Sequence, residues 1–235
     1  MEMTPISTEF CPPTAVVIIS GGLDSSTLAY HLQAGGSRLM LLSFDYGQRH
    51  RRELDAAAIV AAGLVARHHI VDVQSVGALL AGSAITDSYV EVPDGHYTDE
   101  TMKITVVPNR NALMLDVAIA VAVVEQADAV AFGAHAGDHT IYPDCRPEFI
   151  DALQVCAWVG NDGFLADGFR ILAPFLTWSK AEIVRRGAEL GVPFGDTWSC
   201  YKGGAVHCGR CGTCTERREA FALAGVPDPT VYAAG

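Results

Sequence analysis

The feature that most constrains the fold is a glycine-rich turn near the start of the chain. A continuous apolar run over residues 15–19 leads directly into Ser20-Gly21-Gly22-Leu23-Asp24-Ser25-Ser26, and a helical pattern follows. The run predicts a strand buried on both faces, and two glycines let the backbone turn sharply and approach a ligand closely. Free N–H groups at the start of the helix, together with the serine hydroxyls, suit an anion. The segment therefore predicts a phosphate-binding loop.

This loop differs from two common nucleotide-binding motifs. It lacks the Gly-Lys-Ser/Thr ending of a Walker A loop and the Gly-x-Gly-x-x-Gly of a dinucleotide fold. It also carries Asp24, which is unexpected beside polyphosphate unless the carboxylate orients the loop or holds Mg²⁺.

Strand and helix patterns alternate along most of the chain. Buried-strand patterns occupy residues 15–19, 39–44, 70–73, 129–132 and 169–173, and helical patterns occupy 25–33, 51–64, 111–126, 147–159 and 179–190. Ser179 with Glu182 forms the capping-box pattern of a helix start. The alternation predicts an α/β fold, a parallel sheet flanked by helices, whose ligands bind beyond the carboxyl ends of the strands. We expect one domain over residues 1–235, with a loop or small insertion near residues 81–107.

Composition and charge exclude several classes of protein. The 235 residues carry a formal net charge of −11, which disfavours a broad nucleic-acid surface because such a surface clusters Lys and Arg. No apolar stretch reaches the length of a membrane helix, and the first residues lack a signal-peptide pattern. We therefore expect a cytoplasmic protein without a nucleic-acid or membrane partner; a homodimer is compatible with the sequence.

Four of the seven cysteines lie close together near the end of the chain. Cys200, Cys208, Cys211 and Cys214 fall within fifteen residues, among turn-forming glycines. In a cytosolic protein this spacing indicates metal binding before disulfides. Four thiolates close a tetrahedral zinc shell and make it structural, within a segment over residues 196–216. His207 is a competing ligand, and an iron–sulfur cluster is the alternative.

The loop and four further segments resemble one family. Ser-Gly-Gly-x-Asp-Ser is similar to the signature of the PP-loop ATP pyrophosphatases, which adenylate a substrate oxygen on a nucleotide-hydrolase-like fold. Within them the chain resembles the QueC type in the cysteine run and in segments 44–50, 107–111 and 142–149. One departure is Asn109 where the family often has glycine; since Asn tolerates the left-handed conformation, we expect little change.

The resemblance and the residue types together assign roles. ATP is expected at residues Ser20 to Ser26, with Asp24, Ser25, Arg110 and Asp144 in catalysis. The substrate is expected to contact Arg49, Arg110, Asp144 and Arg146, because guanidinium groups suit carboxylate and phosphate. Lys180 is a candidate phosphate contact, and an exposed helix lysine is the alternative. His135 and His139 stand four residues apart, but the intervening glycine favours a loop over a second metal site.

The resemblance also implies a reaction. ATP would adenylate the carboxylate of 7-carboxy-7-deazaguanine, ammonia would displace AMP to give the amide, and a second activation would dehydrate the amide to a nitrile. Mg²⁺ would spread the phosphate charge, and zinc is favoured over iron because no redox step is needed. The rivals are a related ligase that joins the deazaguanine to a protein amine, a PP-loop tRNA thiolase, which the charge of −11 disfavours, and a non-catalytic nucleotide-binding or zinc-dependent module.

Overall fold

The protein is built on one parallel five-stranded sheet. The structure, a computed structural model, describes residues 11–80, 82–87, 89–96, 98–138 and 142–233. The sheet has the order β3-β2-β1-β4-β5, and every neighbouring pair is parallel. The strands are β1 (Thr14–Ile18), β2 (Arg38–Asp45), β3 (Arg67–Asp72), β4 (Ala129–Ala131) and β5 (Arg170–Leu172). The predicted α/β class is confirmed.

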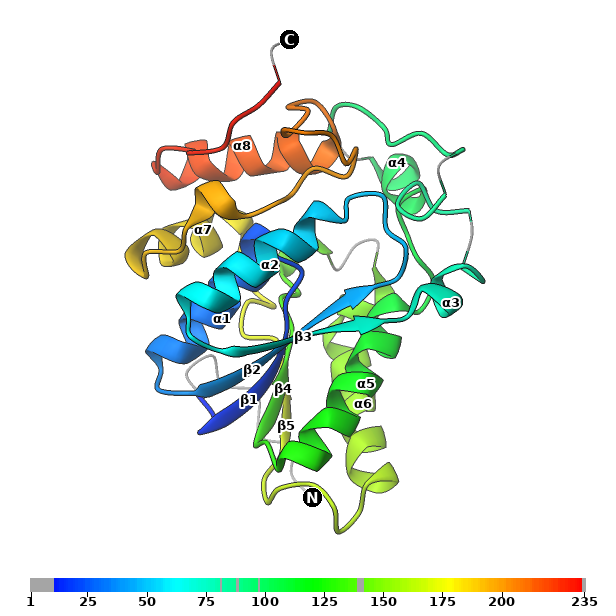
Figure 1. The fold of residues 1–235 in the computed structure, drawn as a ribbon, viewed down its shortest axis with the longest axis vertical. Helices are drawn as coiled ribbons and strands as arrows, with labels where there is room; N and C mark the ends of the chain where they lie inside the picture. The colour runs from blue at the N-terminus through cyan, green and yellow to red at the C-terminus, as the bar shows by residue number, and fades with distance from the viewer. Residues whose placement is uncertain (1–10, 81, 88, 97, 139–141, 234–235) are drawn as a thin grey trace.

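Helices cover both faces of this sheet (Figure 1). One core packs α1 (Leu23–Ala34), α2 (Arg52–Gly63) and α7 (Lys180–Glu189) on the sheet through residues such as Leu28, Val60 and Ile183. The opposite core packs α5 (Arg110–Glu125) and α6 (Pro147–Gly160) through residues such as Leu115 and Ile150. The central strand β1 is buried through Ala15, Val16 and Val17 because helices shield both of its faces.

Two local predictions at helix starts are confirmed. Ser179 accepts a hydrogen bond from the backbone N–H of Glu182, whose side chain returns one to Ser179, and this capping box begins α7. Asn109 lies directly before α5 with a φ of 57°, in the left-handed region that asparagine tolerates.

The tail after residue 195 contains a helix that the sequence did not predict. Helix α8 (Gly212–Ala224) follows the cysteine segment and packs against α7. Cys214 lies in its first turn, so the cysteine segment leads into a regular helix. The tail packs against the main core through the buried residues Ala220 and Phe221.

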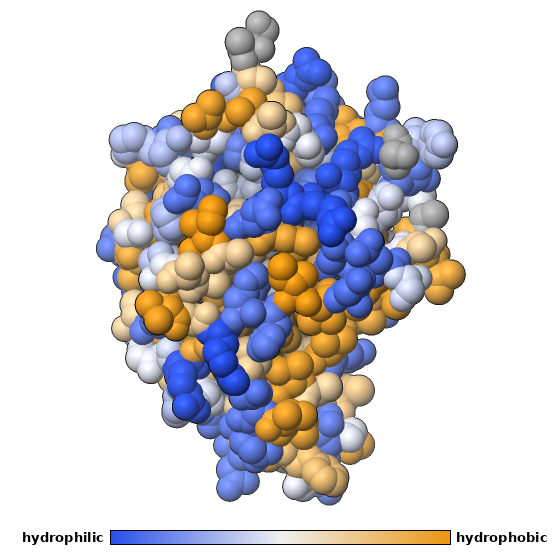
Figure 2. Space-filling model, in the orientation of Figure 1, coloured by the Kyte–Doolittle hydropathy of each residue, from blue (hydrophilic) through white to orange (hydrophobic). Residues whose placement is uncertain are grey.

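The other short elements are α3 (Gln74–Gly77) and the 3-10 turns η1 (Ala136–Asp138), η2 (Pro143–Cys145) and η3 (Phe194–Asp196). The segment near residues 81–107 that the sequence left open contains the short helix α4 (Asp99–Lys103). A backbone bridge joins Asp94 to Cys211, so this segment contacts the cysteine tail. None of the helices in the described part of the chain has the length and apolarity to span a bilayer. On the face that Figure 2 shows, hydrophilic residues gather in the upper half, near the start of α2, and apolar residues form a band below them.

Candidate active site at the carboxyl end of the sheet

One cleft collects residues from the ends of three strands and from the tail. It has a volume of about 250 Å³ and is lined at its base by Ile18, Phe44 and Phe132, which lie at the carboxyl ends of β1, β2 and β4. Polar side chains from the phosphate loop, α5, α7 and α8 also line it. Ligands of parallel α/β sheets bind at this edge, so the cleft is the candidate active site.

The phosphate loop forms one wall of the cleft. Ser25 Oγ lies 3.0 Å from Ser20 Oγ and accepts a hydrogen bond from the Ser20 N–H at 3.1 Å. Gly22 is the N-cap of α1 and provides no side-chain cap. The first N–H groups of this helix therefore keep their capacity to bind an anion.

Gly21 fixes the loop against α2. Its φ is +77°, and a Cβ at this position would lie 2.2 Å from the carbonyl oxygen of Glu53. Only glycine fits this close approach without moving α2. The loop residues Ser20, Gly22, Leu23, Asp24 and Ser25 line the cleft, whereas Gly21 and the fully buried Ser26 are not among its lining residues.

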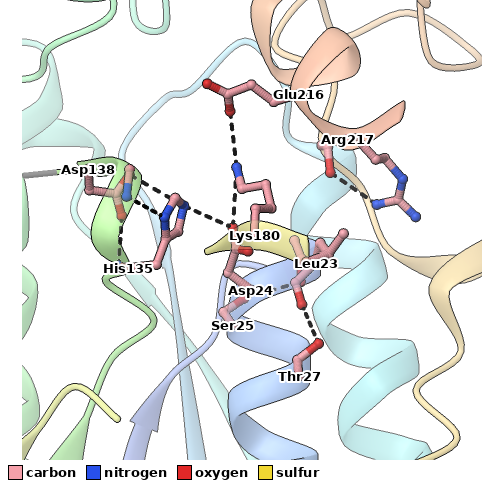
Figure 3. A network of polar contacts seen from close by, with 12 residues as sticks. Leu23, Asp24, Ser25, Thr27, His135, Asp138, Lys180, Glu216 and Arg217 are labelled. Carbon is pink, nitrogen blue, oxygen red and sulfur yellow. Dashed lines mark hydrogen bonds and ion pairs between the residues drawn. The ribbon is translucent and has the colours of Figure 1, made fainter. Parts of the chain in front are cut away.

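A charged network lies beside the loop (Figure 3). Lys180 Nζ lies 3.0 Å from Glu216 Oε2 and 3.7 Å from Asp24 Oδ2. Burial alone would lower the pKa of Lys180, but the carboxylates of Asp24, Glu216 and Asp138 raise it above its ordinary value. The lysine therefore stays charged at neutral pH. Its side chain is 23% exposed, so it is a partly buried residue of the cleft.

Asp24 is suited to a cation. Its Oδ1 is buried and has no hydrogen-bond partner among the described residues, while its Oδ2 faces Lys180 and lies 3.9 Å from His135 Nε2. A buried carboxylate oxygen without a partner is costly unless a ligand satisfies it. Oxygen is the donor that Mg²⁺ prefers, so the carboxylate fits this ion.

His135 belongs to the same network. Its Nδ1 accepts a hydrogen bond from the Gly137 N–H at 3.0 Å, and its Nε2 lies 3.6 Å from Asp138 Oδ1. Its ring therefore presents Nε2 to the carboxylates. The prediction for His139 lies outside the described residues.

Arg110 is a half-buried cation in the cleft. The tyrosines Tyr46, Tyr201 and Tyr142 lie close enough to shift its pKa. Burial alone would lower the pKa of Arg110, but these phenolic groups raise it. No carboxylate forms an ion pair with Arg110 in the part of the chain that the structure describes. The guanidinium is therefore a site for an anionic ligand group.

The structure does not bring the other predicted substrate residues into the cleft. Arg49 donates to the carbonyl oxygens of Asp87 and Val90, at 2.7 and 2.9 Å, and so holds the loop that contains them. Asp144 accepts the backbone N–H of Asn111 at 3.1 Å at the start of α5. Arg146 is exposed at the N-cap of α6. None of these three lines the cleft, and their contact with a substrate stays a prediction.

The four cysteines form a second, separate site. The Sγ atoms of Cys200, Cys208, Cys211 and Cys214 all lie within 4.8 Å of one another, and the Sγ atoms of Cys208 and Cys214 are 3.9 Å apart. A tetrahedral shell with Zn–S distances of about 2.3 Å places sulfurs about 3.8 Å apart, so the cluster fits zinc.

His207 makes a hydrogen bond outside the cysteine cluster. Its Nε2 accepts the backbone N–H of Ser199 at 3.1 Å, and the cluster of candidate ligands contains only the four cysteines.

Sequence reasoning missed several residues of the cleft. Glu216, Arg217 and Tyr201 come from the tail, and His50 and Glu53 come from the start of α2. His50 lies in one of the family-like segments, and its spacing of three residues from Glu53 at a helix start was an available signal. Glu216, two residues after the last cysteine, gave no signal that it would meet Lys180.

The fold and the cleft define a class of protein. A parallel α/β sheet with this serine- and glycine-rich loop between β1 and α1, and a four-cysteine cluster beside it, is a PP-loop protein with a site suited to a metal ion. The family model for the queuosine biosynthesis protein QueC matches residues 14–225. The chain therefore belongs to the QueC family, and the resemblance inferred from the motifs is confirmed.

The similarity to known proteins extends over nearly the whole chain. The 7-cyano-7-deazaguanine synthase of Rhizobium meliloti (strain 1021) is 61% identical over 217 residues, which are 92% of this chain and 91% of that protein. The protein of the same name from Allorhizobium ampelinum is 60% identical over the same shares. Among solved structures, NMN synthetase from Francisella tularensis is similar at 17% identity with a TM-score of 0.49, covering 92% of this chain and 79% of that chain.

Proposed function

We propose that this protein is a 7-cyano-7-deazaguanine synthase. It would use ATP to convert 7-carboxy-7-deazaguanine and ammonia to the nitrile, through an adenylate and an amide. The observation that carries this proposal is about 60% identity to synthases of that name over nine-tenths of both chains. The cleft supports it, because a phosphate loop, a lysine and the guanidinium of Arg110 line the same space.

The charges of the cleft suit the first step. N–H groups at the start of α1 and the Lys180 ammonium would bind the phosphates of ATP. Arg110 would hold the carboxylate, and Tyr46, Tyr142 and Tyr201 offer aromatic rings to the planar bicyclic substrate. Held in this way, a carboxylate oxygen can attack the α-phosphorus with release of pyrophosphate. Orientation of two bound reactants is itself a large part of such catalysis.

Two metal ions belong to the proposal. Asp24, through its unpartnered Oδ1, would hold Mg²⁺, which neutralises phosphate charge when it is bound. The four cysteines would hold one structural Zn²⁺, because four thiolates leave no open coordination position. The cytosolic location, the homodimer and the single domain over residues 1–235 stay predictions.

The test is a reconstituted reaction. Purified protein is incubated with 7-carboxy-7-deazaguanine, ATP, Mg²⁺ and ammonium, and the products are identified by mass. We expect the nitrile, AMP and pyrophosphate, with the amide appearing first. Omission of the acid should stop AMP formation. Turnover of ATP that ignores the acid, or a product in which the acid is unchanged, would contradict the proposal.

A further inference from the structure

A buried histidine and glutamate lie in the cleft without a role in the adenylation step. His50 Nε2 lies 3.1 Å from Glu53 Oε2, and both residues line the cleft. Gln48 donates from Nε2 to the other carboxylate oxygen of Glu53 at 2.9 Å. The same amide nitrogen donates to the Phe44 carbonyl, and Gln48 Oε1 accepts the Tyr46 N–H. The carboxylate is therefore held at both of its oxygens.

The remaining ring nitrogen of His50 is unsatisfied. Residue His50 is 2% exposed, and its Nδ1 is buried without a hydrogen-bond partner in the described part of the chain. The ring of Tyr201 covers it, with ring centroids 4.8 Å apart. Leaving a buried polar atom unpaired costs about 1–3 kcal/mol, and such atoms require an explanation such as a catalytic role. Nδ1 is therefore an unused hydrogen-bonding atom of a residue that lines the cleft.

Glu53 determines which nitrogen carries the proton. A carboxylate 3.1 Å from Nε2 repels a lone pair on that nitrogen and attracts an N–H, so Nε2 is protonated in the neutral ring. The lone pair is then on Nδ1, the nitrogen that lacks a partner. When Nδ1 gains a proton, the same carboxylate stabilises the imidazolium, as in other carboxylate–histidine pairs.

We propose that His50 Nδ1 binds ammonia and accepts its proton when the amide forms, with Glu53 as the positioning residue. This inference rests on the proposed function, which requires ammonia to attack the acyl adenylate. Ammonia is close to water in size and has N–H donors for an acceptor such as Nδ1. It therefore fits the hydrogen-bonding capacity of this nitrogen.

The bonds and protons of the amide-forming step balance. The ammonia nitrogen attacks the acyl carbon, a C–N bond forms, and the nitrogen becomes positively charged. Nδ1 removes one proton from it. The C–O bond to AMP then breaks, AMP leaves with the electron pair, and the amide remains. His50 returns its proton to solvent after the products leave. Without an acceptor the charged nitrogen would be expelled again more readily than AMP.

The experiment compares two nucleophiles on the variant His50→Gln. The glutamine amide can keep contact with Glu53 but lacks a basic nitrogen. Hydroxylamine is far less basic than ammonia, so its adduct loses a proton to water without help. We expect acid-dependent ATP–pyrophosphate exchange and hydroxamate formation to persist, and ammonia-dependent amide formation to fall by about 10²-fold or more. Glu53→Gln should shift the hydroxylamine-to-ammonia ratio in the same direction by a smaller factor.

Controls keep the result interpretable. His69→Gln changes an exposed histidine on β3 outside the cleft and should behave as wild type. The ratio of the two nucleophiles is measured on one preparation, so an unfolded fraction cancels. An unchanged ratio in folded His50→Gln, or loss of exchange along with both nucleophile reactions, would overturn the assignment. Absence of acid-dependent exchange in wild type would instead reject the proposed function itself.

Discussion

Lys180 Nζ lies 3.0 Å from Glu216 Oε2, which connects the first residue of α7 to the second turn of α8 (Figure 3). Glu216 follows Cys214 by two residues, so the cysteine cluster and the phosphate cleft share one short helix segment. The same ammonium faces Asp24 of the phosphate loop. One lysine thus connects the loop, the last helix and, through it, the cysteine site.

The first prediction concerns this lysine. Lys180→Met should weaken ATP binding by at least about tenfold, or about 1.4 kcal/mol, because the carboxylates of Asp24, Glu216 and Asp138 would then face the phosphates without the lysine ammonium between them. Lys180→Arg should retain more affinity. The double variant Lys180→Met/Glu216→Gln should recover part of the loss, since one negative charge is removed with the positive one. Calorimetric titration with a non-hydrolysable ATP analogue measures all three. Additive effects would show that the two residues are not coupled.

The second prediction concerns the phosphate loop. Asp24→Ala and Ser25→Ala should each lower product formation by about 10²-fold or more, while the thermal unfolding midpoint stays near that of wild type. Asp24→Asn keeps the volume and removes the charge, which separates charge from packing. Wild-type turnover by the folded double variant would place the active site elsewhere.

A third prediction separates two residues that the sequence grouped together. Arg110→Ala should raise the KM for the deazaguanine acid much more than the KM for ATP, because the guanidinium lies in the cleft and has no carboxylate partner among the described residues. Asp144→Asn should have a smaller effect, since its amide oxygen can still accept the Asn111 N–H that Asp144 accepts now. Steady-state kinetics with each substrate varied in turn decides this. Equal damage to both KM values by Arg110→Ala would remove it from the substrate site.

The sequence predicted the strands, helices and motifs that depend on local residue patterns. The expected strand at 15–19 is β1 at Thr14–Ile18, the helix at 179–190 is α7 at Lys180–Glu189, and both follow from periodicity and caps. The sequence predicted the phosphate loop because a strand, two glycines and a helix follow one another directly. It predicted a metal site at the four cysteines because they are separated by few residues.

What the sequence could not show depends on packing between distant segments. Glu216 meets Lys180 across 36 residues, and Tyr201 covers His50 from the far end of the chain. No periodicity encodes such contacts. Arg49 shows another limit of the sequence. Its place after a strand suggested a ligand contact, which stays a prediction, but nothing in the sequence indicated that its guanidinium would donate to two backbone carbonyls.

A fourth prediction tests how the tail is held. Arg217 is 1% exposed and donates to Thr230, Thr197, Ser199 and the Phe194 carbonyl. Arg217→Ala leaves these groups buried without their donor, so the free energy of unfolding should fall by about 3 kcal/mol. The exposed neighbour Arg218 is the control, and its alanine variant should cost about 0.5 kcal/mol. Chemical denaturation measures both. Equal losses would mean that burial of Arg217 contributes little.

The last prediction concerns the metal. Purified protein should contain one zinc per chain, and X-ray absorption should show four sulfur neighbours at about 2.3 Å. Replacing Cys200 by serine leaves an incomplete shell, so zinc content and the unfolding midpoint should fall together. Activity should fall with them, because the tail supplies Glu216 and Tyr201 to the cleft. The control is Cys156→Ser, an exposed cysteine outside the cluster. Iron in place of zinc, or a nitrogen neighbour from His207, would contradict the assignment.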